Sequence, residues 1–278
     1  MADRPQLQAP GGACDCHMHF YDVAERYPVA PTAAFLPPPA SLADYRKVQQ
    51  RLGLERVVVV QPTASGTDNR CTMDAVTEIG EAARAVVVVD QAADDHQLEA
   101  LTRDGARGIR FHMFQGGVLP WDILEEMAAR VHAFGWHVQL QCNGRELPER
   151  EALLRRLPGT LVIDHIGRFE DPVPPDHPAF KTLLGLVESG RVWIKLSAPY
   201  QSSRSGPPAY EDVSALARAL VAAAPERMLW ASNWPHPGRS DPQERDDARA
   251  LDLLLDWAPD DATRERILTE NPAALYGF

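Results

Sequence analysis

Eight short apolar runs, separated by helix-like segments, constrain the fold of this chain more than any other feature. The runs are CDCHMHF, RVVVVQ, AVVVVD, GIRFHMF, HVQLQC, LVIDHIG, VWIKLSA and MLWASNW. Residues 57–60 and 86–89 are apolar on both faces, as strands of a buried parallel sheet must be. The alternation predicts a single (β/α)8 TIM barrel with its active site at the carboxyl ends of the strands.

Helical patterns lie between and after these runs. We expect helices over residues 41–52, 69–84, 96–104, 121–134, 147–157, 179–189, 211–224 and 262–275. An open doubly wound sheet is the alternative, but no Gly-rich phosphate loop follows the first run. Because no internal repeat or linker interrupts the pattern, residues 1–278 are expected to form one domain.

Composition excludes several classes of partner. The net charge of −11 argues against binding to nucleic acid or to an anionic membrane surface. No apolar run approaches the roughly 20 residues of a membrane span, and MADRPQLQAP does not resemble a signal peptide. The 4 cysteines lack zinc-type spacing, which indicates reduced thiols and a cytoplasmic protein. Homo-oligomerisation stays open.

Polar side chains gather where the predicted strands end. They are His17 and His19 in the first run, Arg70 beyond the second, Arg110 and His112 in the fourth, Gln139 and Gln141 in the fifth, Asp164, His165 and Arg168 around the sixth, Tyr200 and Arg204 beyond the seventh, and Asn233 and His236 in and after the eighth. Because the strands of a barrel end at one mouth, these side chains are predicted to converge there.

The His-x-His pair is the most specific of these patterns. Side chains at i and i+2 of a strand point the same way, so His17 and His19 can share a divalent metal or one substrate oxygen. The same alternation predicts that Cys14 and Cys16 face away from the histidines, so neither is assigned a nucleophilic role.

Three motifs together resemble the amidohydrolase superfamily, in its amidohydrolase-related (amidohydrolase 2) branch. They are DCHMH at 15–19, DHIGR at 164–168 and WASNWPHP at 230–237, and the resemblance covers essentially the whole chain. HMHFYD, QPTASGTDNR, GIRFHMF and DHIGR resemble the 2-pyrone-4,6-dicarboxylate lactonases. LADYRKVQQRLGLERVVVVQ, APYQSSRSGPP and the asparagine of SNWPH resemble the D-galactarolactone isomerases.

The resemblance implies an enzyme that acts on a small carboxylated lactone without a tightly held metal. The chain departs from each subgroup, since Asn233 replaces the lactonase aspartate that would activate water, whereas His17 and His19 are both present and the isomerase pattern loses the first histidine. Hydrolysis is ranked first because both histidines are present, and isomerisation, which Asn233 favours, is the alternative. A non-catalytic barrel that binds sugar acids is a third hypothesis.

Residue chemistry then assigns roles. We expect His17, His19, His165 and Asn233 to be catalytic, and Arg70, Arg110, Arg168, Tyr200, Arg204 and His236 to bind the substrate. No cofactor is expected, because Asn233 is a poor fourth metal ligand and no lysine ends the fourth strand to carry a carbamate. If a divalent ion such as zinc were bound, its ligands would be His17, His19 and His165.

Overall fold

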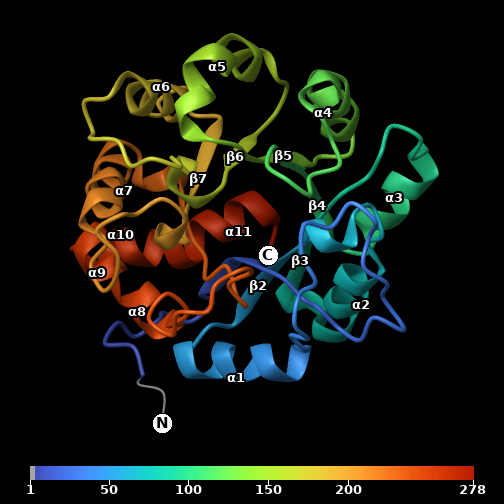
Figure 1. Ribbon diagram of the computed structural model, residues 1–278, viewed down its shortest axis with the longest axis horizontal. Coiled ribbons are helices and arrows are strands. Elements are labelled where there is room, and N and C mark those ends of the chain that lie inside the picture. Colours follow the sequence, from blue (N-terminus) through green and yellow to red (C-terminus); the bar gives the residue numbers. More distant parts are fainter. Residues whose placement is uncertain (1–3) are drawn as a thin grey trace.

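The computed structural model describes residues 4–278 and contains the predicted (β/α)8 barrel (Figure 1). Its strands are β1 (Cys14–Met18), β2 (Arg56–Val60), β3 (Ala83–Val87), β4 (Ala106–His112), β5 (His137–Gln141), β6 (Leu161–Ile163), β7 (Val192–Leu196) and β8 (Met228–Trp230). Neighbouring strands pair in parallel in the order β1 to β8. A parallel bridge between Met18 and Trp234 joins the segment beyond β8 to β1.

Helices surround the strands, as Figure 1 shows. They are α1 (Leu42–Leu52), α2 (Arg70–Ile79), α3 (Asp95–Arg103), α4 (Leu124–His132), α5 (Leu147–Arg156), α6 (Pro178–Val187), α7 (Glu211–Ala223), α8 (Asp247–Asp252), α9 (Leu254–Trp257), α10 (Asp261–Glu265) and α11 (Asn271–Tyr276). Ser41 and Asp94 cap the N-termini of α1 and α3 by accepting hydrogen bonds from backbone N–H groups. None of the helices formed by residues 4–278 combines the length and apolar character needed to cross a membrane.

Two of the predicted helices differ from those in the structure: one ends early, and the other is divided in its middle. The helix expected over 69–84 stops at Ile79, because Gly80 has a φ of 82° and turns the chain into β3 at Ala83. The helix expected over 262–275 is divided by a π-helical turn, Arg266–Glu270, between α10 and α11. An apolar repeat does not reveal one residue inserted into a helical turn, so this division was not visible in the sequence.

A bulge in β1 overturns the prediction for the cysteines. Asp15 pairs with Val57 and Met18 with Val59, so β1 advances by three residues while β2 advances by two. The extra residue lets Cys16 and His17 both point into the barrel. Cys14 and Cys16 are fully buried against strand residues and the Tyr276 ring, on the same side of β1 as the histidines rather than away from them.

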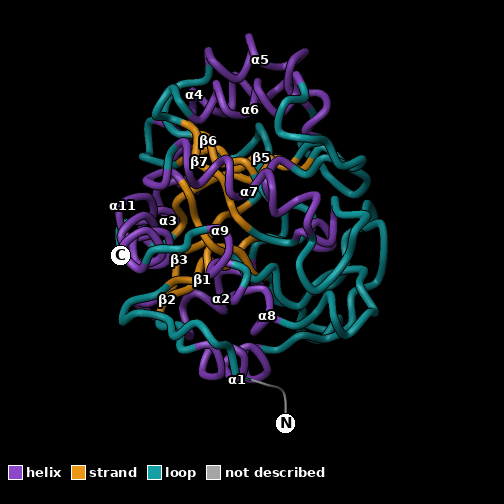
Figure 2. Tube along the Cα trace, turned by 90° about the vertical axis from the view of Figure 1, so that its left-hand side faces the viewer, coloured by secondary structure: helices purple, strands orange, loops and turns teal. Residues whose placement is uncertain are grey.

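The long loops lie at one end of the barrel. Figure 2 shows them to the right of the strands, with α11 and the C-terminus on the opposite side. At that opposite end Tyr276 is fully buried, and the Arg84 guanidinium donates hydrogen bonds to the carbonyls of Tyr276 and Gly277. The segments after β1, β4, β6, β7 and β8 therefore form the open end, and α11 covers the closed end.

Candidate active site

A pocket of 390 Å³ opens among the loops at the carboxyl ends of the strands. The predicted site residues that line it are His19, Arg110, His165, Arg168 and Asn233, together with Tyr21, Thr63, His112, Gln141, Glu170 and Gln201 among others. Strands and loops far apart in the sequence therefore bring these side chains together, as the barrel prediction requires.

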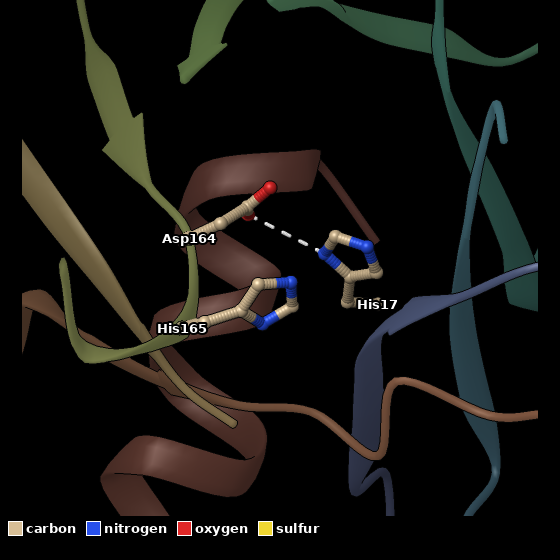
Figure 3. Close-up of side chains that lie close together, drawn as sticks. All are labelled: His17, Asp164 and His165. Carbon is tan, nitrogen blue, oxygen red and sulfur yellow. Dashed lines mark ion pairs between the residues drawn. The ribbon is translucent and has the colours of Figure 1, made fainter. Parts of the chain in front are cut away.

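His17 lies beneath the pocket and faces β6. In Figure 3 the side chains of His17, Asp164 and His165 point toward one another. His17 Nδ1 is 3.3 Å from Asp164 Oδ1, and the ring centroids of His17 and His165 are 4.9 Å apart. All three side chains are buried, and the bulge in β1 is the local feature that directs His17 to this position.

The two histidines of β1 are joined by a hydrogen bond of defined direction. His19 Nδ1 lies 2.8 Å from the carbonyl oxygen of Val60, which can only accept, so Nδ1 carries the proton. His19 Nε2 therefore accepts from His17 Nε2 at 3.2 Å. Burial, with nearby positive charge, lowers the pKa of His19 to about 3 and the pKa of His17 well below its ordinary value. Both imidazoles are neutral at pH 7 and connect the barrel interior to the pocket.

Lys195 is a buried residue of the site whose role the sequence did not reveal. Its Nζ donates to Gln139 Oε1 at 2.6 Å and lies 3.4 Å from His17 Nδ1 and 3.8 Å from Asp164 Oδ1. Burial lowers the pKa of Lys195 to about 8, while Asp164 opposes that shift. The ammonium is therefore mostly present at pH 7, where it offsets the buried carboxylate and supplies a donor to His17.

The chain after β6 has an unusual backbone. His165, Ile166 and Arg168 have φ values of 53°, 56° and 40°, in the left-handed region that such residues rarely adopt. Gly167, at φ 81°, packs so closely that a Cβ there would lie 2.8 Å from Leu183. Such conformations cluster at functional sites, and here they direct His165 and Arg168 into the pocket.

Two arginines give the pocket a positive charge. Arg110 donates from its terminal nitrogens to the Gln61 carbonyl and to Gln141 Oε1, both at 2.8 Å. The Arg168 guanidinium lies 3.6 Å from the centroid of the Phe114 ring, and burial lowers the pKa of Arg168 to about 10. The buried Nε atoms of both arginines lack a hydrogen-bond partner within the described part of the chain. Because both residues line the pocket, their guanidinium groups can pair with a bound anion.

Asn233 is the only one of the predicted β8 residues that lines this pocket. It has a φ of 61°, and its backbone N–H donates to the carbonyl of His17 at 2.8 Å. Its side chain donates from Nδ2 to Tyr200 Oη at 2.8 Å. Tyr200 and His236, predicted to bind substrate, are buried behind Asn233 and do not line this pocket.

Two of the predicted substrate arginines lie outside the pocket. Arg70 is paired with Asp68 at 2.6 Å and its side chain is 62% exposed, and Arg204 is paired with Asp171 and is 75% exposed. Their assignment to the substrate site is therefore corrected. Both follow a strand end in sequence, but the loops turn them toward solvent, where a local carboxylate holds each one.

The residues do not fit a catalytic divalent ion. The ligand atoms of His17, Asp164 and His165 lie within 4.8 Å of one another, but Asp164, the carboxylate of that group, already faces the Lys195 ammonium. The ligand set predicted from the sequence has His19 in place of Asp164 and therefore consists of three neutral imidazoles. Its fourth candidate ligand is the amide of Asn233, which carries no charge. Positive charge from Lys195 and Arg110 further opposes a bound cation.

Protein purified without added metal is expected to contain well under one zinc equivalent per chain and to keep its activity in chelator. The reason is that the Asp164 carboxylate, which would be the anionic ligand, is paired with Lys195. Elemental analysis and assays after dialysis against chelator measure both quantities. Stoichiometric metal, with activity lost on removal and restored on return, would overturn this expectation.

Comparison with known proteins places these features in a family. A family model described as Amidohydrolase matches residues 14–278. D-galactarolactone isomerase of Agrobacterium fabrum is 39% identical over 98% of this chain and 93% of that protein. The 2-pyrone-4,6-dicarboxylate hydrolase of Comamonas testosteroni is 36% identical over 98% of this chain and 92% of that protein.

A solved structure agrees. The apo structure of Agrobacterium tumefaciens ATU3138 superposes with a TM-score of 0.92 at 38% identity, over 99% of this chain and 98% of that one. The family match, the two relatives and the shared fold each extend over nearly the full length described above. This chain belongs to the amidohydrolase family.

Proposed function

We propose that this protein isomerises a small carboxylated lactone by moving the acyl group to another hydroxyl of the same molecule. The observation that carries the proposal is the amide of Asn233 at the end of β8, inside a pocket whose arginines have unpaired donors. Within residues 4–278 Glu170, which is exposed, is the only carboxylate that lines this pocket. The relatives named above, an isomerase and a hydrolase of lactones, support the substrate class.

The reaction needs no net water. The oxygen of a substrate hydroxyl attacks the lactone carbonyl carbon, and a new C–O bond forms. The ring C–O bond then breaks, and the departing oxygen receives the proton that the attacking hydroxyl lost. The guanidinium of Arg110 or Arg168 can stabilise the oxyanion between these steps, and His165, whose Nδ1 contacts Ser197 while its Nε2 is not engaged within residues 4–278, can carry the proton.

The nucleophile decides between isomerisation and hydrolysis. The strength of the base does not separate the two reactions, because a substrate hydroxyl is about as weak an acid as water and the same imidazoles would serve both. A hydroxyl of the bound substrate has the advantage of effective concentrations that reach about 10⁵–10⁸ M in well-oriented cases. An amide can orient that hydroxyl although it cannot deprotonate water. The sequence ranked hydrolysis first, and the pocket favours the reverse order.

Hydrolysis is the second candidate, because both histidines of β1 are present and hydrogen-bonded at 3.2 Å. Proton NMR of a galactarolactone and of 2-pyrone-4,6-dicarboxylate after incubation with the protein separates the two reactions. With the galactarolactone, isomerisation gives a rearranged lactone before any open acid, and hydrolysis gives the open acid directly. The pyrone has no hydroxyl to receive its acyl group, so it reports hydrolysis alone. Open acid as the first and only product would overturn the isomerase proposal, and no turnover of either lactone would count against both.

Arg168→Met is expected to raise the KM for a carboxylated lactone by about 10- to 100-fold, because a hydrogen bond to a charged group contributes about 1.5–3 kcal/mol. Arg168→Lys should recover only part of this, since lysine lacks the planar fork. Arg204→Met is the matched control, because Arg204 is exposed and paired outside the pocket. Steady-state kinetics test this, and equal effects of Arg168→Met and Arg204→Met would contradict it.

A further inference from the structure

A chain of hydrogen bonds runs from the pocket to the surface behind Asn233. Asn233 Nδ2 donates to Tyr200 Oη at 2.8 Å, and that hydroxyl lies 3.0 Å from His236 Nδ1. His236 Nε2 lies 2.9 Å from Asp247 Oδ1, and Arg51 donates to Asp247 Oδ2 at 3.3 Å. Tyr200, His236 and Asp247 are all buried, so water does not replace these contacts.

With Asn233 Nδ2 directed at Tyr200, as in this structure, the donors and acceptors along this series of hydrogen bonds have one direction when His236 carries a single ring proton. The Tyr200 oxygen accepts from the amide, so its own proton is free to reach His236 Nδ1. His236 Nδ1 is then the acceptor, and the ring proton lies on Nε2, where Asp247 accepts it. Asp247 therefore sets the tautomer of His236, and that tautomer sets the direction of the Tyr200 hydroxyl.

This direction fixes what Asn233 offers to a bound molecule. Its Nδ2 is held by Tyr200, while its Oδ1 accepts no hydrogen bond within residues 4–278 and the residue lines the pocket. The amide is thus held as an acceptor for a substrate O–H.

A carboxylate at position 233 would not fit the same chain. A carboxylate and His236 Nδ1 are both acceptors, and the Tyr200 hydroxyl between them has one proton to give. Either one acceptor is left unpaired, or His236 takes up a proton and becomes an imidazolium. The surroundings of position 233 are therefore arranged for an amide.

We propose that Tyr200, His236 and Asp247 are positioning residues that hold the Asn233 side chain with its carbonyl toward the substrate hydroxyl. The kinetic part of this inference rests on the proposed isomerase function. Its structural part, which concerns the tautomer of His236 and the orientation of the amide, is independent of that function.

Kinetics test the coupling between Tyr200 and Asn233. Tyr200→Phe is expected to lower kcat by about 10-fold or more with a smaller change in KM, because the nucleophile is less well oriented. In the Asn233→Ala background the same substitution should cost nothing further, since Tyr200 acts through Asn233. Tyr210→Phe is the control, because Tyr210 is buried nearby and its hydroxyl makes no hydrogen bond within the residues that the structure describes. Equal losses of kcat from Tyr200→Phe in both backgrounds would overturn the proposal.

NMR of the histidine ring nitrogens tests the direction without any substrate. The wild-type His236 is expected to carry its ring proton on Nε2, where Asp247 accepts it, and to accept from Tyr200 on Nδ1, and Asn233→Asp should shift the Nδ1 signal because the Tyr200 hydroxyl then has two acceptors. A wild-type Nδ1–H tautomer, or a His236 spectrum unchanged by Asn233→Asp, would overturn the inference. If no lactone is turned over, the proposed function fails while this measurement still decides the orientation of the amide.

Discussion

Lys195→Met is expected to destabilise the protein by about 3–5 kcal/mol at pH 7, because it leaves the buried Asp164 carboxylate without its cation. Gln139 Oε1 would lose its 2.6 Å hydrogen bond as well. Asp164 Oδ1 already lacks a hydrogen-bond partner within residues 4–278, so little else can compensate. Urea unfolding of the wild type and the variant measures the difference.

The double variant Lys195→Met/Asp164→Asn separates charge from packing. Removing the carboxylate together with the ammonium restores neutrality, so it should be more stable than Lys195→Met alone. Lys47→Met provides the control, since Lys47 is exposed on α1 and pairs with Asp44 at the surface, and the urea midpoint of this variant should match that of the wild type. A Lys195→Met variant as stable as the wild type would show that Asp164 does not depend on the ammonium.

The protein is expected to lose at least about 4–5 kcal/mol of stability between pH 7 and pH 5, a total that leaves out His17 and His165, whose pKa values burial also lowers. Burial lowers the pKa of His19, His112 and His137 to about 3, whereas each titrates near 6.5 in the unfolded chain. Below pH 6.5 the unfolded chain therefore binds more protons than the native state, and stability falls as pH falls toward 3. One pH unit corresponds to about 1.4 kcal/mol per titrating group. Each of these three histidines therefore lowers the free energy of unfolding by about 2 kcal/mol by pH 5.

Asp15 offsets part of this loss. Burial raises the pKa of Asp15 to about 6 from its ordinary value of 3.8, so the native state takes up this proton before the unfolded chain does as pH falls below 6. This proton uptake by the native state raises the free energy of unfolding by about 1 kcal/mol by pH 5.

Urea unfolding at half-unit pH intervals measures the balance. His137→Gln should reduce the change in the free energy of unfolding with pH. His96→Gln, on the exposed face of α3, should leave that change as it is in the wild type. A free energy of unfolding that stays constant between pH 7 and pH 5 would contradict the neutral state of the buried imidazoles.

The barrel was predictable because its pattern is periodic. Runs such as residues 57–60, apolar on both faces, have few alternatives to a buried parallel strand, and the polar residue at each strand end follows from the chain direction. His19, His165, Asn233, Arg110 and Arg168 were found in this way, because each lies within a few residues of a strand end.

The residues that sequence reasoning missed depend on distant partners. Asp247 lies in a charge-rich helix that reads as a solvated surface, yet it is buried because His236 lies opposite. Lys195 lies within β7 and is tolerated there only because Asp164 and Gln139 are adjacent in space. The bulge in β1 changes the direction of Cys16 without changing its neighbours in sequence. Arg70 and Arg204 were predicted to lie in the pocket but do not. Each forms an ion pair with an aspartate outside it, Asp68 for Arg70 and Asp171 for Arg204.

Asp15 also affects when the barrel can be completed during synthesis. It lies on β1, but it accepts hydrogen bonds from the backbone N–H and the hydroxyl of Ser232, 217 residues later in the chain. Until the ribosome has made Ser232, this carboxylate lacks those partners, and β1 lacks the neighbour that β8 provides. The first strand to emerge is thus among the last to reach its final environment, so a nascent chain stalled before β8 should expose an unpaired strand edge to chaperones and proteases.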